Sequence, residues 1–171
     1  PGDVQWMTAG RGIIHSEEPH ADFQKNGGRM HGFQIWINLP AKHKMMKPRY
    51  QEIPEKMSPT TEKDGVWARV VAGECLGLQS SIDTMVPIEF IHVKMDEGST
   101  LEKEMDTSLN AMIYVFGGEI MVQNKSVKDG ELALLSDGDR IVIQSSISSE
   151  FLILAGPELN EPIARHGPFV M

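Results

Sequence analysis

His15 and Glu17 are two residues near the start of the chain whose types and spacing could do metal chemistry. In an extended segment, side chains two positions apart point to the same face, so the imidazole and the carboxylate would lie side by side. A nitrogen donor and an oxygen donor on one face are two of the ligands that a mononuclear non-haem iron or manganese site needs. The alternative is a histidine held by an ordinary hydrogen bond beside a solvated acid.

The residues before this pair are expected to position it. Pro1-Gly2 is a turn-forming pair, because proline presets a negative φ and glycine accepts a positive one. A run rich in β-formers (VQWM, residues 4–7) comes next, and a glycine-rich bend at residues 9–12 follows it. We therefore predict a turn, a short strand and a bend that lead the chain to His15.

Residues 1–17 form a pattern that is more specific than the pair alone. They read Pro-Gly-Asp-x-x-Trp-Met-x-Ala-Gly-x-Gly-Ile-x-His-x-Glu, which resembles the second metal-binding motif of the pirin family, a branch of the cupin superfamily. The resemblance continues through GFQIWINLP at residues 32–40 and YQE at residues 50–52, and it returns in EPIARHGPFVM at residues 161–171. It therefore covers nearly the whole chain.

The resemblance implies an all-β fold of two tandem cupin β-barrels, a bicupin, in which the first barrel is incomplete in this chain. We expect residues 1–56 to form the second half of the N-terminal, metal-binding barrel together with the start of a linker. Residues 57–171 are expected to form a C-terminal barrel that is degenerate and metal-free. Compared with the family pattern, the chain is expected to lack the N-terminal strands and the C-terminal helical tail.

The resemblance also implies a ligand set. Pirins hold iron in the N-terminal barrel through three histidines and one glutamate, and the last histidine and the glutamate match His15 and Glu17. The other two histidines form a His-x-His pair upstream of the Pro-Gly-Asp turn, and no later histidine of this chain stands in such a pair. We therefore expect Fe(II) as the cofactor, with Mn, Ni, Cu or Zn as other divalent metals that such a site could take.

Two functions from different classes follow from this resemblance. Some pirin relatives resemble quercetin 2,3-dioxygenases, which open a flavonol ring with O₂. That function implies a small aromatic, flavonol-like substrate and O₂, with Glu17 as the catalytic carboxylate that accepts the flavonol hydroxyl proton. Other pirins are iron-dependent transcription cofactors or bind metabolic enzymes, which implies a non-enzymatic regulatory protein with a protein partner. Both functions need His15 and Glu17.

Composition and charge exclude several other classes of function. Residues 1–56 hold eight Lys and Arg against six Asp and Glu, whereas residues 57–171 hold eight against eighteen, so the net charge of −8 resides in the second part. An acidic surface argues against direct nucleic-acid binding. No apolar run is long enough to cross a bilayer, so we expect no membrane association. The single Cys75 suits a reducing compartment, the cytoplasm or, in a eukaryote, also the nucleus.

The rest of the chain reads as short strands separated by turns. Residues 33–39 alternate apolar and polar side chains, which predicts a half-buried strand. A linker is expected at residues 40–65, which contain four prolines. Further β-rich runs lie at residues 66–72, 88–95, 112–116, 119–122, 132–135, 140–143 and 151–155. In the degenerate second barrel, Glu104, Asp106 and Asn110 stand where a cupin motif would place metal ligands, and His92 is expected to be a hydrogen-bonded barrel histidine.

Overall fold

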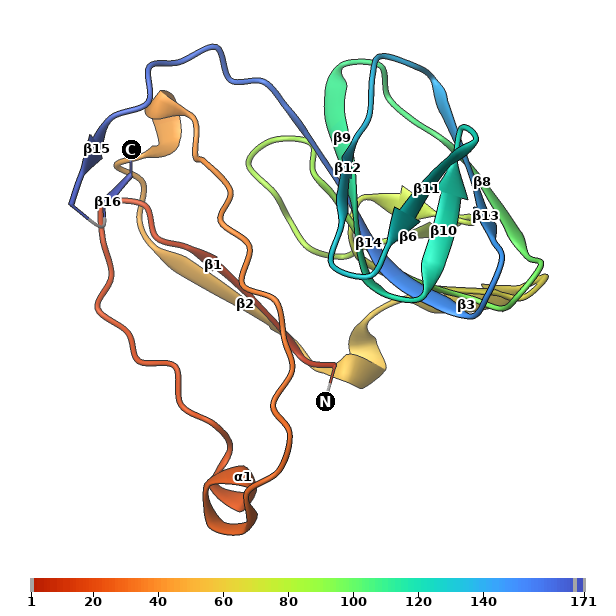
Figure 1. Ribbon diagram of the computed structural model, residues 1–171. Coiled ribbons are helices and arrows are strands. Elements are labelled where there is room, and N and C mark those ends of the chain that lie inside the picture. The colour runs from red at the N-terminus through yellow and green to blue at the C-terminus, as the bar shows by residue number, and fades with distance from the viewer. Residues whose placement is uncertain (1, 168, 171) are drawn as a thin grey trace. The chain divides into compact units, whose positions relative to one another are not determined.

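The computed structural model describes residues 2–167 and 169–170, and these are mostly β-strands and irregular segments (Figure 1). Contacts divide the chain into two compact units. The barrel unit consists of Pro1–Trp6 and Gln51–Asn160, and the loop unit consists of Met7–Tyr50 and Glu161–Met171. Strands β1 (Val4–Thr8) and β2 (Arg49–Ile53) pair with each other, and each crosses the boundary between the units.

The barrel unit is built from two antiparallel sheets. The six-stranded sheet has the order β12-β9-β14-β7-β4-β3, and the four-stranded sheet has the order β11-β10-β13-β8. A short hairpin of β5 (Glu74–Cys75) and β6 (Leu78–Gln79) is added to them. The six-stranded sheet comprises β3 (Thr60–Lys63), β4 (Val66–Ala72), β7 (Glu89–Met95), β9 (Leu109–Gly117), β12 (Leu132–Leu134) and β14 (Ser149–Pro157). The four-stranded sheet comprises β8 (Thr100–Glu104), β10 (Glu119–Val122), β11 (Lys125–Lys128) and β13 (Arg140–Ser145).

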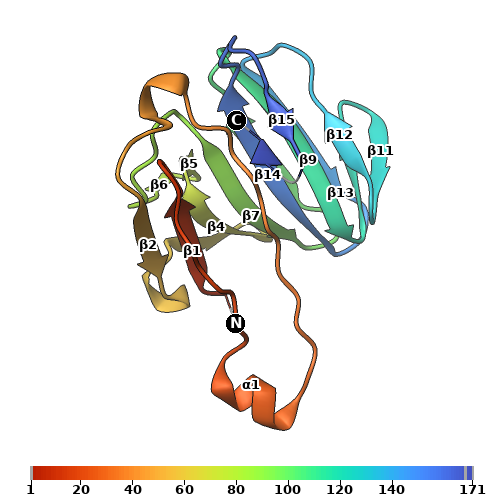
Figure 2. The ribbon, with the colours of Figure 1, turned by 90° about the vertical axis from the view of Figure 1, so that its left-hand side faces the viewer.

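Register explains how the six-stranded sheet contributes to the core. Ile153 of β14 lies opposite Ile91 of β7 on one side and Ile113 of β9 on the other, and Ile91 also faces Val70 of β4. Figure 2 shows β7, β14 and β9 side by side. Because side chains alternate along each strand, the inner face of the sheet is a continuous apolar surface. It packs against the inner residues of the other sheet, Leu101, Ile120, Ile141 and Ile143. The β-rich runs predicted between residues 66 and 155 are confirmed.

A charged pair is buried in the barrel unit beside its apolar core. Lys103 Nζ of β8 is 2.8 Å from Glu89 Oε1 of β7, and the two side chains are only 6% and 11% exposed. Lys103 Nζ also donates to the Glu104 carbonyl at 3.0 Å, whereas Glu89 Oε2 is buried without a hydrogen-bond partner among the described residues.

Burial raises the pKa of the nearby Cys75 thiol, so this cysteine stays protonated.

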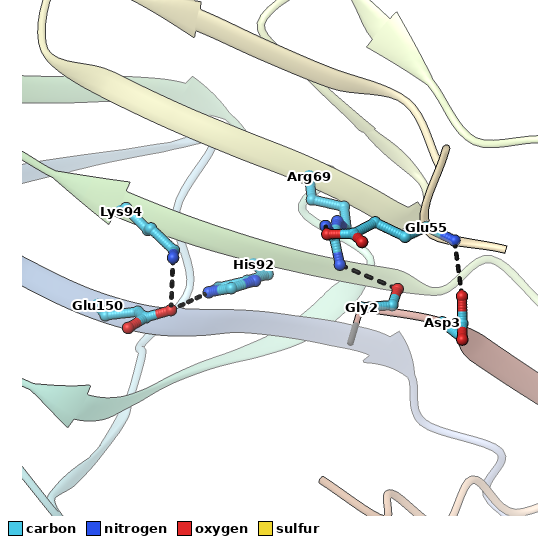
Figure 3. Close-up of polar contacts among 7 residues, drawn as sticks. All are labelled: Gly2, Asp3, Glu55, Arg69, His92, Lys94 and Glu150. Atoms are coloured by element: carbon cyan, nitrogen blue, oxygen red, sulfur yellow. Dashed lines mark hydrogen bonds and ion pairs between the residues drawn. The ribbon is translucent and has the colours of Figure 1, made fainter. Parts of the chain in front are cut away.

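The turn predicted at Pro1-Gly2 includes Pro1, which lies outside the described residues. Gly2 and Asp3, directly ahead of β1, are held by Arg69 and Glu55 (Figure 3). Arg69 Nη1 of β4 donates to the Gly2 carbonyl at 3.0 Å, and its Nη2 lies 3.1 Å from Glu55 Oε1. The Glu55 backbone N–H in turn donates to Asp3 Oδ1 at 3.0 Å. Glu55 begins the 3₁₀ turn η2 (Glu55–Met57). These contacts fix the point at which the chain enters β1, and so the start of the segment that leads to His15.

The loop unit contains little regular structure. Its elements are α1 (Ala21–Asn26), the 3₁₀ turn η1 (Ala41–His43), and the two-residue strands β15 (Arg165–His166) and β16 (Phe169–Val170), which pair. The strand predicted at residues 33–39 is wrong: this segment is irregular, and Trp36 within it is 73% exposed. A strand of alternating residues needs a neighbouring strand and a core to cover its apolar face. In the part of the chain that the structure describes, no strand pairs with this segment.

No helix in residues 2–167 or 169–170 is long and apolar enough to cross a membrane.

Candidate metal centre

A glycine bend connects β1 to the segment that carries His15. The Gly12 N–H donates to the Ala9 carbonyl at 3.0 Å, a hydrogen bond within the bend. The Arg11 N–H donates to the Met46 carbonyl at 3.0 Å, which connects the bend to another segment of the loop unit. Gly10 has φ of +52°, and a Cβ on it would lie 2.2 Å from the Met46 oxygen. Only glycine fits this position, because it lacks the atom that would clash.

Replacing Gly10 by alanine is therefore expected to open this bend. The positive φ costs about 1–3 kcal/mol for a residue with a Cβ, and the Met46 carbonyl must also move away. We expect Gly10→Ala to lower the free energy of unfolding and to weaken iron binding together. Gly32→Ala is the matched control, since a Cβ at Gly32 meets nothing within 4 Å and its φ is not positive. Urea unfolding and calorimetric titration with Fe(II) measure both effects. If the two variants had the same free energy of unfolding and the same Fe(II) affinity, the bend would not be needed to position His15.

His15 and Glu17 lie beside each other, although the segment around them is irregular. His15 Nε2 is 3.7 Å from Glu17 Oε1, and the two side chains are 35% and 57% exposed. This distance is too long for a hydrogen bond. Two donors about 2.1 Å from a common ion lie roughly 3.0 Å apart at a right angle and about 3.6 Å apart at 120°. The separation and the donor types therefore fit two ligands of one transition-metal ion.

Gln34 is a third residue of this cluster, and sequence reasoning gave it no role. Its Nε2 donates to Glu17 Oε2 at 3.1 Å, so the two carboxylate oxygens have different neighbours. The only sequence signal for it was its place in the string GFQIWINLP, within the segment wrongly expected to be a strand. The contact joins residues seventeen positions apart through irregular chain, which periodicity does not predict.

The described residues offer no larger set of ligands. No group of three or more His, Cys, Asp or Glu side chains lies close enough in residues 2–167 and 169–170 to hold a metal ion. In the barrel unit, Asp106 Oδ1 instead accepts hydrogen bonds from the backbone N–H and the hydroxyl of Ser108, which lower the pKa of Asp106. That the barrel unit binds no metal at Glu104, Asp106 or Asn110 stays a prediction.

His92 is hydrogen-bonded within the outer face of the six-stranded sheet, which confirms the sequence expectation. Its Nε2 lies 2.7 Å from Glu150 Oε1, and Lys94 Nζ lies 3.4 Å from the same oxygen (Figure 3). The imidazole packs edge-on against Trp67, with 5.1 Å between ring centroids. Burial lowers the pKa of His92 below its ordinary value of 6.5, and the bond to Glu150 offsets only part of that effect.

This lowered pKa predicts how stability depends on pH. Between the folded pKa of His92 and the unfolded value of 6.5, the unfolded chain binds more protons, so stability falls as pH falls through that window. Glu150 favours the charged imidazole, whereas Lys94 and Arg69 oppose it. His92→Gln is expected to reduce the loss of unfolding free energy between pH 7 and pH 5, while His43→Gln leaves it unchanged. Urea unfolding at several pH values measures this, and an identical pH dependence in all three proteins would contradict it.

Comparison with known proteins identifies the family. The pirin family model matches residues 1–37, and the model of the pirin C-terminal cupin domain matches residues 90–171. "Pirin" of Homo sapiens is 36% identical over 177 residues, covering 100% of this chain. "Pirin-like protein 2" of Arabidopsis thaliana is 37% identical over 180 residues, covering 99% of this chain. The chain belongs to the pirin family.

Comparison with solved structures identifies the fold class of this pirin. A crystal structure of quercetin 2,3-dioxygenase from Acinetobacter baumannii matches with a TM-score of 0.91 and 32% identity, over 99% of this chain and 60% of that one. The fold is an all-β bicupin with a partial first barrel. The chain spans 59% of the length of human pirin and 54% of the Arabidopsis relative. The match to the pirin model at residues 1–37 contains His15, Glu17 and Gln34.

Proposed function

We propose that the protein binds one iron ion through His15 and Glu17 and acts as an oxidoreductase of the quercetin 2,3-dioxygenase type. The observation that carries the proposal is the 3.7 Å separation of His15 Nε2 and Glu17 Oε1, which suits two ligands of one ion. The likeness to a quercetin 2,3-dioxygenase structure at 32% identity supports the reaction class. Two further histidine ligands are proposed to lie upstream of residue 1, and the two barrels are proposed to divide at residues 56 and 57.

In this proposal the chain supplies ligands and a base. Bound iron would activate O₂ and orient a flavonol-like substrate. Glu17 holds the one carboxylate that this cluster offers as a base, and its 57% exposure leaves it accessible to a substrate hydroxyl. Its carboxylate would accept the hydroxyl proton, while Nε2 of His15 would donate its lone pair to the metal.

Oxygen uptake by the iron-loaded protein, with and without quercetin, tests this function. We expect O₂ consumption that requires both iron and quercetin, and we expect Glu17→Gln to abolish it. Glu18→Gln is the matched control, because Glu18 is the adjacent, exposed glutamate. Iron-loaded protein that consumes no O₂ with quercetin or related flavonols would contradict the enzymatic proposal.

A non-enzymatic, iron-dependent regulatory role is the second candidate. It is favoured by the names of the curated relatives, which are "Pirin" and "Pirin-like protein 2" and mention no reaction. The same two ligands would then bind iron to set the conformation of a surface for a protein partner. Tight iron binding without O₂ uptake is the result that this candidate predicts.

A further inference from the structure

We propose that Gln34 is a positioning residue that orients the Glu17 carboxylate toward His15 and makes it a ligand through one oxygen. The inference deepens the proposed function, because it rests on His15 and Glu17 as ligands of one metal ion. It assigns to Gln34 the task of holding one of those ligands rather than binding the ion itself.

The contacts of Glu17 carry the first step. Gln34 Nε2 lies 3.1 Å from Oε2, whereas His15 Nε2 lies 3.7 Å from Oε1. An ionised carboxylate only accepts hydrogen bonds, so the amide must present its NH₂ group to Oε2. One oxygen is therefore occupied by a donor, and the other is left on the side of the imidazole.

The exposure of Glu17 carries the second step. With 57% of its side chain exposed, packing does little to hold this carboxylate in one rotamer. A charge-assisted hydrogen bond is directional and stronger than a neutral one, so the amide can select the orientation that packing does not. Hydrogen bonds that orient a ligand are a general requirement of metal sites, and losing one commonly lowers metal affinity 10–100-fold, roughly.

The segment that carries Gln34 is held in place by hydrogen bonds of the residues that follow it in the sequence. Lys44 Nζ donates to Asn38 Oδ1 at 2.8 Å and to the Leu39 carbonyl at 2.7 Å. The Ala41 N–H donates to Glu161 Oε2 at 2.8 Å. These contacts anchor the end of the irregular segment that carries Gln34, all within the loop unit.

The test compares Gln34→Met, which keeps the length of the side chain but removes the donor, with Gln24→Met. Gln24 is also an exposed glutamine of the loop unit whose amide donates a hydrogen bond, to the Pro19 carbonyl at 2.8 Å. The protein is used with any sequence that flanks this chain. Fe(II) affinity is measured by anaerobic calorimetry, and Co(II) absorption in the visible range reports ligand geometry.

We expect Gln34→Met to lower Fe(II) affinity about tenfold and to shift the Co(II) bands, while Gln24→Met matches the wild type. Wild-type affinity and spectrum in Gln34→Met, or the same changes in Gln24→Met, would overturn the role of Gln34. His15→Asn separates the two proposals. If it abolishes binding while Gln34→Met has no effect, only the inference about Gln34 fails; if it binds as the wild type does, the proposed metal site fails as well.

Discussion

Replacing His15 by asparagine is expected to abolish stoichiometric iron binding. The substitution removes the imidazole nitrogen that lies 3.7 Å from Glu17 Oε1 and leaves one donor of the pair. Because each ligand contributes both affinity and geometric constraint, we expect the affinity for Fe(II) to fall by at least about 100-fold. Anaerobic calorimetric titration and metal analysis of the purified protein measure the loss.

His20→Asn is the matched control for this experiment. His20 is exposed and lies in the same unit, and its Nδ1 accepts the Asp22 N–H at 3.3 Å to cap α1. Asparagine can make the same kind of cap, so the helix is preserved. Loss of iron in both variants, or retention of wild-type affinity in His15→Asn, would contradict the assignment of His15.

Lys103→Met is expected to cause a large loss of stability in the barrel unit. It leaves the Glu89 carboxylate buried without its cation, and Glu89 Oε2 already has no partner among the described residues. Breaking a buried ion pair from one side costs roughly 3–5 kcal/mol. Urea unfolding, followed by tryptophan fluorescence, to which Trp67 in β4 contributes, measures the change.

Two further variants distinguish a buried charge from loss of a lysine in general. The double variant Lys103→Met with Glu89→Leu is expected to recover most of the stability, because no charge is left in the core. Arg140→Met removes an exposed pair, in which Nη1 lies 3.4 Å from Glu102 Oε2 and both side chains are 61% exposed, and should cost at most about 1 kcal/mol. A double variant less stable than Lys103→Met alone would contradict this explanation.

Alternation predicted the strands of the barrel unit because those strands have a core beside them. In β7, Ile91, Val93 and Met95 are buried while Lys94 between them is exposed, as a period of two requires. Residues 33–39 show the same alternation, yet they form no strand. The difference lies in the neighbours: hydrogen bonds and burial come from other parts of the chain, which a local pattern does not contain.

In the candidate site, too, the sequence predicted some of the residues and missed others. His15 and Glu17 were predicted from their types and spacing together with the resemblance of residues 1–17 to the pirin motif, and the structure places the two side chains 3.7 Å apart. That they bind a metal stays a prediction. Gln34 was not predicted, since its contact with Glu17 depends on the path of two irregular segments. The Lys103–Glu89 pair was missed as well, because the alternation of β8 only points Lys103 inward, and the partner follows from how two sheets face each other.

Anomalous X-ray diffraction at the iron edge, from crystals of the iron-loaded protein with any sequence that flanks this chain, tests the metal centre most directly. We predict one peak about 2.0–2.3 Å from His15 Nε2 and from a carboxylate oxygen of Glu17, with no peak near Glu104, Asp106 or Asn110. A peak in the barrel unit, or an iron ion that His15 and Glu17 do not contact, would contradict the account.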